Sequence, residues 1–297
     1  MTVLTASLPE FAILTVRGKD SAKLLQGQLT CDVMKMDEQH WQLGACCTAK
    51  GRMVANFLIA RQDDNFYLRL SRDVAEVLKQ HLSKYAVFYK TTLEVSNLAV
   101  VGTLANDQEA AEPLSTTLVD ARGDLETAAA DIHWDDDAIR IEWPDGRSEL
   151  WSEADAEQQP EDDNSNIHSR WLQADMALGL VWVTAESSEK WVPQHAGWGL
   201  AGGINFKKGC YTGQEVVARL EYLGKTKKQL TAVQLSNESM TVEIALPMNV
   251  SNADGRNVAE LIAWYDNAGL AISSVSEKQD GHLQTGEAVI LTPPTQS

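Results

Sequence analysis

The C-terminal part of the chain is a succession of short apolar segments, and this pattern restricts the fold more than any other feature. The segments are rich in Val, Ile, Leu and Thr and are bounded by polar or turn-forming residues, which is typical of short β-strands. Several such strands in a row form a barrel or a sandwich. We therefore expect a small C-terminal β-barrel or sandwich with strands at 229–236, 241–247, 258–265, 270–275 and 287–293.

The first half of the chain mixes strand and helix signals. A β-branched apolar run at Phe11–Gly18 predicts a buried strand, and Asp20 can cap a helix after it. The segment 52–71 has two apolar stretches around a turn-like QDDN, which predicts a hairpin, and Ser71 can cap a second helix. Because 297 residues exceed one ordinary domain, we expect an α+β protein of two or three domains.

The middle of the chain is polar and acidic before it becomes helical. The stretch Ser152–Asn164 contains acids and no base, which is typical of a solvated loop. Apolar residues at Ile167, Trp171, Met176 and Leu178 then predict a helix.

The net charge of −17, from 42 acidic and 25 basic residues, disfavours a broad nucleic-acid surface, which needs clustered Lys and Arg. The N-terminal residues lack the features of a signal peptide, and no apolar run has the length of a membrane span. Four cysteines, at 31, 46, 47 and 210, are too few and too irregular for a disulfide scaffold. We therefore expect a cytoplasmic protein with reduced thiols, no membrane contact and no strong direct nucleic-acid binding.

One segment, KKGCYTGQE at Lys207–Glu215, reverses this charge. Residues 205–230 include six bases and two acids, a net charge of +4. Positive neighbours and a following helix start would favour the thiolate form of Cys210. Gly209 and Gly213, on either side of the cysteine, allow a sharp turn and the close approach of a partner.

The residues alone leave three interpretations of this segment open: a reactive or ligating thiol, a structural turn with a small buried cysteine, and a phosphate-binding loop. The phosphate loop is the weakest, because neither Walker A nor GxGxxG spacing is present. A cysteine hydrolase needs a histidine base, and none of the six histidines has a diagnostic neighbourhood, although His195 is nearest along the chain. The chain has no C-x-x-C pair, so we expect no metal site.

The same segment carries a resemblance to a known family. Lys208–Glu215 resembles the K-G-C-[FY]-x-G-Q-E signature of the YgfZ family, folate-binding proteins related to the T protein of the glycine cleavage system. Other segments resemble blocks of that family in the same order: Gly18–Val33, Ala49–Met53, Lys84–Lys90, Trp191–Gln194 and Gly202–Cys210.

The resemblance implies a GcvT-like and YgfZ-like α+β fold, a three-domain ring around a central channel that binds tetrahydrofolate, closed by a C-terminal β-barrel. For this chain we expect a discontinuous folate-binding α/β domain of residues 1–33 and 116–222, which carries the KGCYTGQE motif. An inserted α/β domain of residues 34–115 and a barrel of residues 223–297 complete the expected monomer.

The resemblance also implies two aromatic contacts to folate, matched here by Phe11 and Trp171. Flat pterin and aminobenzoyl groups gain contact area on rigid aromatic faces. Because Trp171 also fits the apolar face of its expected helix, a position in the core is the alternative for this residue.

Two departures from the glycine-cleavage T proteins bear on the chemistry. Their catalytic aspartate lies in a segment that aligns roughly with 53–59, where this chain has Ala55 and Asn56, and an amide cannot accept a proton as a carboxylate does. Their EAG triplet corresponds here to Ala177–Gly179, so the carboxylate directed at the pterin is absent, and Asp175 is nearby but shifted. Both departures disfavour aminomethyl transfer.

The resemblance therefore leads us to expect a tetrahydrofolate-binding accessory protein for iron–sulfur enzymes, especially radical enzymes that modify tRNA by methylthiolation. Cys210 is the expected reactive centre, and Gln214 and Glu215 are expected to fix its loop or to orient the thiol. The residues assigned to the centre are Lys207, Lys208, Gly209, Cys210, Tyr211, Gly213, Gln214, Glu215 and Arg219.

Two other functions remain open at this point. A folate-dependent one-carbon transferase is the alternative if the protein turns over substrate by itself; our first hypothesis expects no such turnover. A pure interaction scaffold, in which the cysteine is structural, is the third.

Overall fold

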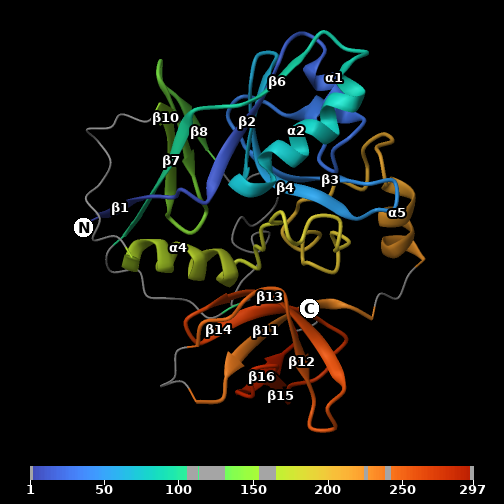
Figure 1. Cartoon of the computed structure of the whole chain (residues 1–297). Coiled ribbons are helices and arrows are strands. Elements are labelled where there is room, and N and C mark those ends of the chain that lie inside the picture. The colour runs from blue at the N-terminus through green and yellow to red at the C-terminus, as the bar shows by residue number, and fades with distance from the viewer. Residues whose placement is uncertain are drawn as a thin grey trace.

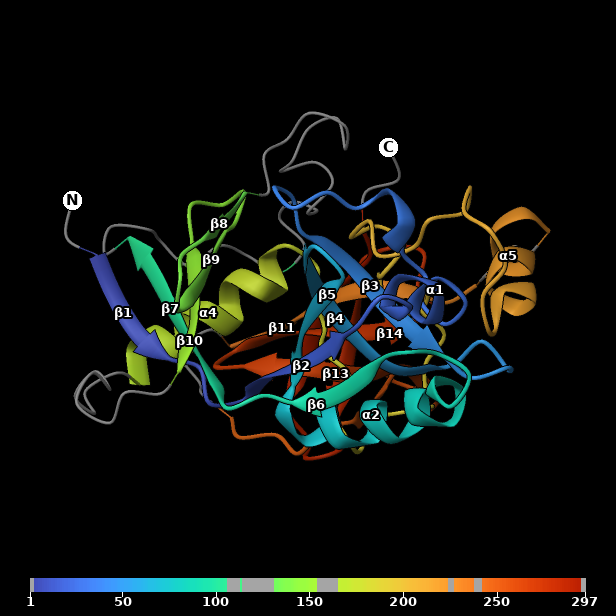
Figure 2. The ribbon, with the colours of Figure 1, turned by 90° about the horizontal axis from the view of Figure 1, so that it is seen from above.

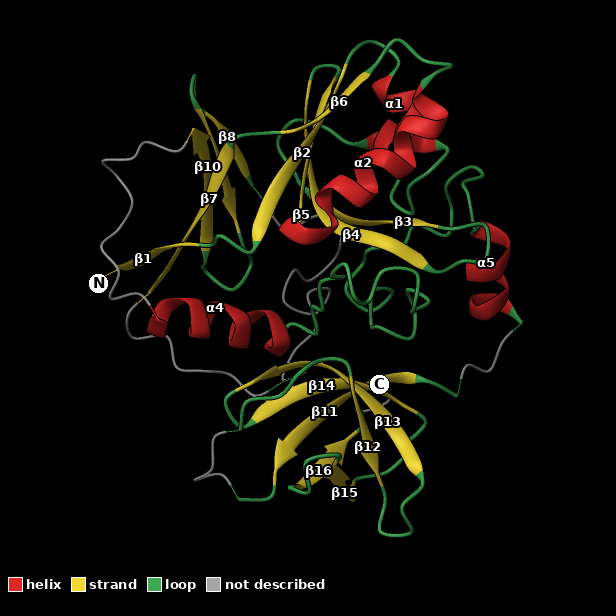
Figure 3. Ribbon diagram, in the orientation of Figure 1, coloured by secondary structure: helices red, strands yellow, loops and turns green. Residues whose placement is uncertain are grey.

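The computed structural model describes residues 3–105, 113, 131–153, 165–223, 227–237 and 242–294. These residues form two five-stranded antiparallel sheets and a closed barrel, accompanied by few helices (Figures 1 and 3). In Figure 1 the two sheets lie side by side in the upper half, and the barrel lies below them. The predicted α+β class and the C-terminal barrel are confirmed.

The first sheet joins strands that are distant in the sequence, because β1 at the N-terminus pairs with β7. Its spatial order is β1 (Val3–Ser7), β7 (Leu98–Ala105), β10 (Ser148–Glu153), β9 (Ala138–Glu142) and β8 (Ile132–Trp134). Helix α4 (Ser165–Ala177) contacts β1 and β7 of this sheet and also β13 of the barrel. The helix therefore connects the first sheet to the barrel.

The second sheet has the spatial order β3 (Gln42–Cys47), β4 (Met53–Gln62), β5 (Asn65–Ser71), β2 (Phe11–Arg17) and β6 (Thr92–Val95). The expected strand at 11–18 and the expected hairpin are thus β2 and the β4–β5 pair. Helix α2 (Arg72–Ala86) packs on this sheet and buries Val74, Leu78 and Leu82, which share one helical face. The shorter α1 (Ser21–Gln26) and the 3-10 turn η1 (Val33–Lys35) follow β2.

Neither expected cap uses its side chain on its own helix. Asp20 precedes α1 and Ser71 precedes α2, but neither side chain makes a capping hydrogen bond. The Asp20 carboxylate instead accepts a hydrogen bond from the backbone N–H of Lys90, at 2.9 Å. Asp20 therefore fixes the connection between α2 and β6, a long-range contact that local sequence cannot reveal.

The strand pairing crosses the expected domain boundary at residue 33. Strand β2 lies before that residue, yet it pairs with β5 and β6, which lie after it. The division at residues 33, 115 and 222 stays a prediction, and the pairing places all five strands between residues 11 and 95 in one sheet.

The barrel is closed by six strands in the order β11 (Gln229–Leu235), β14 (Ala268–Ser273), β13 (Asn257–Tyr265), β12 (Met248–Ser251), β15 (Gln279–Leu283) and β16 (Ala288–Thr292). Four of the five expected segments are strands. The expected strand at 241–247 is wrong, because its described residues, 242–247, form no strand. Strands β12 and β15 were not expected; both are short, and β15 contains Asp, Gly and His.

A segment without helix or strand, residues 178–213, lies between the sheets and the barrel (Figure 1). Backbone hydrogen bonds join it to the second sheet: the Met53 N–H donates to the Trp191 oxygen, and the Glu189 N–H donates to the Met53 oxygen. Helix α5 (Gln214–Tyr222) follows it. Figures 1 and 2 place α5 and β1 at opposite ends of the molecule.

Candidate functional site

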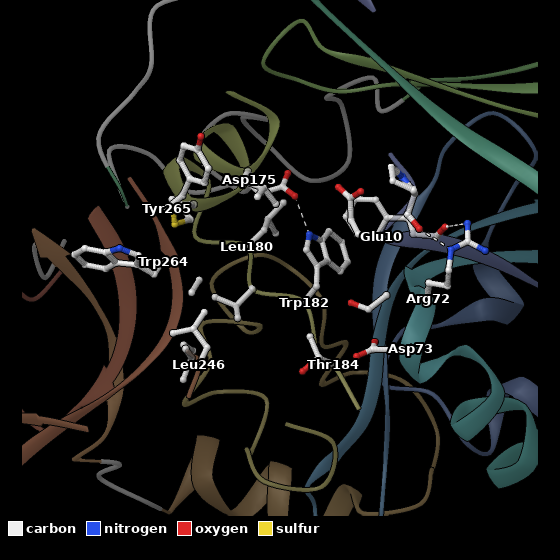
Figure 4. A pocket seen from close by; sticks show the side chains of 18 residues that line it. Glu10, Arg72, Asp73, Asp175, Leu180, Trp182, Thr184, Leu246, Trp264 and Tyr265 are labelled. Atoms are coloured by element: carbon white, nitrogen blue, oxygen red, sulfur yellow. Dashed lines mark hydrogen bonds between the residues drawn. The ribbon is translucent and has the colours of Figure 1, made fainter. Parts of the chain in front are cut away.

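A cavity of about 510 Å³ opens where the second sheet, helix α4 and the barrel meet (Figure 4). Three parts of the chain form its walls. They are the β1–β2 turn with the start of α2, the segment from α4 to Thr184, and a barrel wall that includes β13. The lining residues are Pro9, Glu10, Phe11, Ser71, Arg72, Asp73, Leu172, Asp175, Met176, Leu180, Val181, Trp182, Thr184, Leu246, Ile262, Ala263, Trp264 and Tyr265.

Aromatic rings supply much of the apolar lining. Phe11 and Trp182 meet edge to face, with ring centroids 5.7 Å apart. The buried guanidinium of Arg69 lies over both rings, 4.1 Å from the Phe11 centroid and 4.2 Å from that of Trp182. This cation is paired with Glu149, also fully buried, through hydrogen bonds of 2.6 and 3.2 Å. The aromatic wall is therefore held in place by an ion pair behind it.

Asp175 is the buried carboxylate of α4 that lines the cavity. Its Oδ1 accepts a hydrogen bond from Arg147 Nη1 and its Oδ2 accepts one from Trp182 Nε1, both at 2.8 Å. Burial raises the pKa of Asp175, and the guanidinium of Arg147 opposes that rise. Asp175 thus fixes the orientation of the Trp182 ring in the cavity (Figure 4).

Three more charged side chains line the cavity. Arg72 donates hydrogen bonds to the backbone oxygens of Pro9 and Phe11, at 2.5 and 2.7 Å. Asp73 Oδ2 accepts one from the Ala185 N–H, at 2.9 Å. Burial raises the pKa of the third, Glu10, in part offset by His168 and Arg69.

Trp171, expected to contact folate, lies in the core behind the cavity and is not one of its lining residues. Arg147 lies over its ring at 4.4 Å, and Trp143 meets it edge to face. On its other side the ring packs on Gly102, where an added Cβ would approach it to 2.8 Å. Trp171 does not line the cavity, and Arg147 connects it to the lining residue Asp175.

Cys210, the expected reactive centre, does not line the cavity. Cys210 is exposed, whereas Cys31, Cys46 and Cys47 are buried. Burial raises the pKa of Cys31 and of Cys47 to about 12, and that of Cys46 well above its ordinary value. None of the described residues between 205 and 230 lines the cavity.

Lys208 points into the protein. Its Nζ donates three hydrogen bonds, to the backbone oxygens of Gln26, Leu29 and Cys31, at 2.9, 2.6 and 2.8 Å. Burial lowers the pKa of this amine to about 8, and the Cys31 thiol and Asp32 partly offset that effect. Its three donors are used to hold the chain that follows α1.

The rest of the motif is fixed against the second sheet and α1. The Thr212 N–H donates to the Gly27 oxygen at 3.0 Å. Gly213 has a φ of +85°, and an added Cβ there would lie 2.4 Å from the Thr48 oxygen, so this position requires glycine. Tyr211 is buried, and the Lys208 amine lies 5.1 Å from its ring centroid.

The helix that follows carries the remaining motif residues. Gln214 begins α5, and Glu215 lies in its first turn. Glu215 and Arg219 are exposed, as are Lys207 and Gly209 before the cysteine. The loop therefore presents Cys210 to solvent on a backbone held at both ends.

The structure thus brings Phe11 into the cavity and leaves Trp171 and Cys210 outside it. Glu10 and Trp182 of the cavity were not identified from the sequence. An acid directly before the aromatic assigned to folate was the available signal for Glu10. No periodicity marks Trp182, because its segment has neither helix nor strand.

Asn56, at the position expected to replace a catalytic aspartate, is fully buried. Its Nδ2 donates to the Val181 oxygen and its Oδ1 accepts from the Val183 N–H, both at 2.7 Å. Both ends of the amide therefore bind the two residues that flank Trp182. Asn56 positions the cavity wall.

Neither a metal site nor a membrane-spanning helix is found among the described residues. No cluster of His, Cys, Asp and Glu there could hold a metal ion. No helix among them is both long and apolar enough to span a membrane.

Comparison with solved structures defines the class of fold. The chain is similar to the glycine cleavage system aminomethyltransferase T of Bartonella henselae, with a TM-score of 0.69 over 99% of this chain and 85% of that one. At 11% identity this likeness concerns the fold alone. A comparison with models of protein families gives no match.

Comparison with curated proteins defines the family. The chain is 34% identical over 238 residues to the tRNA-modifying protein YgfZ of Klebsiella pneumoniae (strain 342), which covers 77% of this chain and 70% of that protein. It is 35% identical over 232 residues to the protein of the same name from Enterobacter sp. (strain 638), covering 75% of this chain and 69% of that protein. The chain belongs to the YgfZ family.

Proposed function

We propose that this protein binds tetrahydrofolate in the cavity and supports iron–sulfur enzymes that modify tRNA, with Cys210 as its reactive centre. Its curated relatives are named tRNA-modifying proteins, and the protein that shares its fold is an aminomethyltransferase of the glycine cleavage system. We expect it to act as a cytoplasmic monomer, without turnover of its own and without a strong complex with nucleic acid.

The observation that carries the folate part is the lining of the cavity. A volume of about 510 Å³ is within the range of small-molecule sites. The edge-to-face pair of Phe11 and Trp182 offers rigid aromatic faces to a flat ring, and Leu172 and Leu180 add apolar contact. The residues present fit tetrahydrofolate, whose bound form would supply a carrier for one-carbon groups.

The proposal for Cys210 rests on exposure and on the rigidity of its loop. An exposed thiol on a fixed backbone can meet a partner protein without reorganisation of the loop. Lys207 and Arg219 are exposed bases near Cys210 in the sequence, whereas Lys208 holds the chain after α1. The roles of Gln214 and Glu215 in fixing the loop belong to the same proposal.

A folate-dependent one-carbon transferase is the alternative function. Asn56 does not supply the proton-accepting group that it needs, whereas the carboxyl groups of Glu10, Asp73 and Asp175 line the cavity. Such an enzyme needs a proton-accepting group beside the folate. The amide of Asn56 is engaged at both ends by backbone groups.

Two measurements test the proposal. Calorimetry with purified protein should detect saturable binding of tetrahydrofolate, and Cys210→Ala should bind it with unchanged affinity because Cys210 is outside the cavity. In cells without the chromosomal gene, the same variant should fail to restore tRNA methylthiolation, whereas the conservative surface variant Glu94→Gln should restore it. Full restoration by Cys210→Ala would remove the thiol from the proposal.

A further inference from the structure

Most charged side chains of the cavity are already engaged within the protein. Asp175 accepts a hydrogen bond on each oxygen, from Arg147 and Trp182. Arg72 donates to two backbone oxygens of the β1–β2 turn, and Asp73 accepts from a backbone N–H. These three groups help to build the cavity, so they are poorly available to a ligand.

Glu10 is different. Both of its carboxyl oxygens are buried, and neither has a hydrogen-bond partner among the described residues. The nearest cation is His168, whose Nδ1 lies 3.4 Å from Oε1. Burial of a carboxyl group without a hydrogen-bond donor is costly, and the ion pair with His168 offsets only part of that cost.

The surroundings of Glu10 indicate which donors would satisfy it. Figure 4 shows the carboxyl groups of Glu10 and Asp175 on either side of the Trp182 ring. Asp175 and Glu10 are close enough for the charge of Asp175 to disfavour ionisation of Glu10. A flat ligand that packs against the Phe11 and Trp182 pair carries its N–H groups in the plane of its ring, so these groups lie at the edge of the ring.

We infer that Glu10 recognises the pterin of the bound folate by accepting hydrogen bonds from the 2-amino group and the adjacent ring N–H. This inference rests on the proposed function. The two donors on that edge of a pterin are adjacent and coplanar, so they match the two oxygens of one carboxylate. Glu10 would thereby supply, from the β1–β2 turn, the carboxylate that Ala177–Gly179 does not provide on the α4 side.

The test compares two ligands and two proteins by calorimetry at pH 7: tetrahydrofolate and its 2-desamino analogue, each with the wild type and with Glu10→Gln. Glu10→Gln should weaken tetrahydrofolate binding by about 10- to 100-fold, the range for hydrogen bonds to a charged group. The wild type should bind the 2-desamino analogue more weakly by a similar factor, and the variant should no longer distinguish the two ligands. Glu94→Gln, the same change on the exposed face of β6, should leave both affinities unchanged.

Each outcome has a defined meaning. If tetrahydrofolate binds and Glu10→Gln leaves its affinity unchanged, the inference about Glu10 fails while the proposed function stands. If the variant weakens both ligands equally, Glu10 affects the shape of the cavity and the inference also fails. If the wild type binds no tetrahydrofolate, both are wrong. The wild-type comparison of the two ligands needs no mutation, so it tests the inference even if Glu10→Gln folds poorly.

Discussion

Lys208 Nζ donates a hydrogen bond of 2.8 Å to the backbone oxygen of Cys31, on the opposite side of the loop from the solvent that Cys210 meets. Two more bonds, to Gln26 and Leu29, use the remaining donors of the amine. The lysine that stands two residues before the cysteine therefore serves the structure of the loop. Its ammonium group is fully engaged by three backbone carbonyl groups, at the end of α1 and in the chain that follows it.

Replacement of Lys208 by methionine should lower the free energy of unfolding by about 3 kcal/mol, because it leaves the buried carbonyl groups of Leu29 and Cys31 and the partly buried one of Gln26 without their donor. Urea titration at pH 7 measures this loss. Lys207→Met is the matched control, since Lys207 is exposed, and it should change the stability by less than about 0.5 kcal/mol. Equal stability of the two variants would contradict a structural role for Lys208.

Cys210 should be the first thiol to react with iodoacetamide in the folded protein. It is exposed, while burial keeps Cys31, Cys46 and Cys47 both protonated and inaccessible. Mass spectrometry should find one modified cysteine in the native state and four in urea. Cys210→Ala is the control and should remain unmodified while folded. Labelling of a buried cysteine as fast as that of Cys210 would show that exposure on the loop does not determine which thiol reacts first.

The local sequence pattern predicted most elements of the fold, whereas the class of fold in which they assemble was predicted by the family resemblance. Strand β2, the β4–β5 hairpin and most barrel strands follow from local apolar patterns, which the backbone obeys wherever they are strong. Strands β12 and β15 were not predicted, because they have only four and five residues and include polar ones. Such short segments show too little apolar periodicity to be recognised as strands. The pairing of β1 with β7 is a long-range contact without a local signal.

The candidate site was predictable in part for the same reason. Phe11 was identified by resemblance and does line the cavity. Trp171 and Trp182 are both tryptophans near one helix, and only the packing of Trp171 on Gly102 and Arg147 decides which ring is buried behind the wall. Which of two aromatic side chains faces a cavity depends on tertiary contacts that sequence alone does not contain.

These two tryptophans should respond differently to substitution. Trp182→Ala should weaken tetrahydrofolate binding by about 1–3 kcal/mol, because it removes an aromatic wall of the cavity. Trp171→Ala should instead lower the free energy of unfolding by about 3–5 kcal/mol, the cost of a large cavity in a core. Calorimetry and urea titration separate the two effects. If Trp171→Phe weakened binding more than Trp182→Phe, Trp171 would be the folate contact.

Glu10→Gln should make the protein without ligand more stable at neutral pH. The pKa of Glu10 is raised from its ordinary value of 4.5, so its contribution to stability is present below that value and is lost as the pH rises through the folded-state pKa. The variant should therefore exceed the wild type by about 1 kcal/mol at pH 7 and equal it near pH 4. His168, Arg69 and Asp175 face Glu10 in both proteins. A variant less stable than the wild type at pH 7 would contradict a buried Glu10 carboxylate that lacks a hydrogen-bond donor.

The last prediction concerns tRNA, since the names of the relatives suggest direct binding. A protein that binds tRNA neutralises several phosphates, and its affinity then falls steeply with salt. Here the basic segment lies in a chain of net charge −17, and Lys208 within that segment is turned inward onto three carbonyl groups. We therefore expect no specific complex with tRNA at physiological salt.

A filter-binding titration with bulk tRNA across a salt series measures the affinity. The charge-reversed variant of Lys225, Lys227 and Lys228 provides the comparison, and it should behave as the wild type does. A saturable micromolar complex that weakens with salt and disappears in that variant would show that the segment binds RNA. In that case the proposed effect of the protein on tRNA modification would not need to pass through an iron–sulfur enzyme.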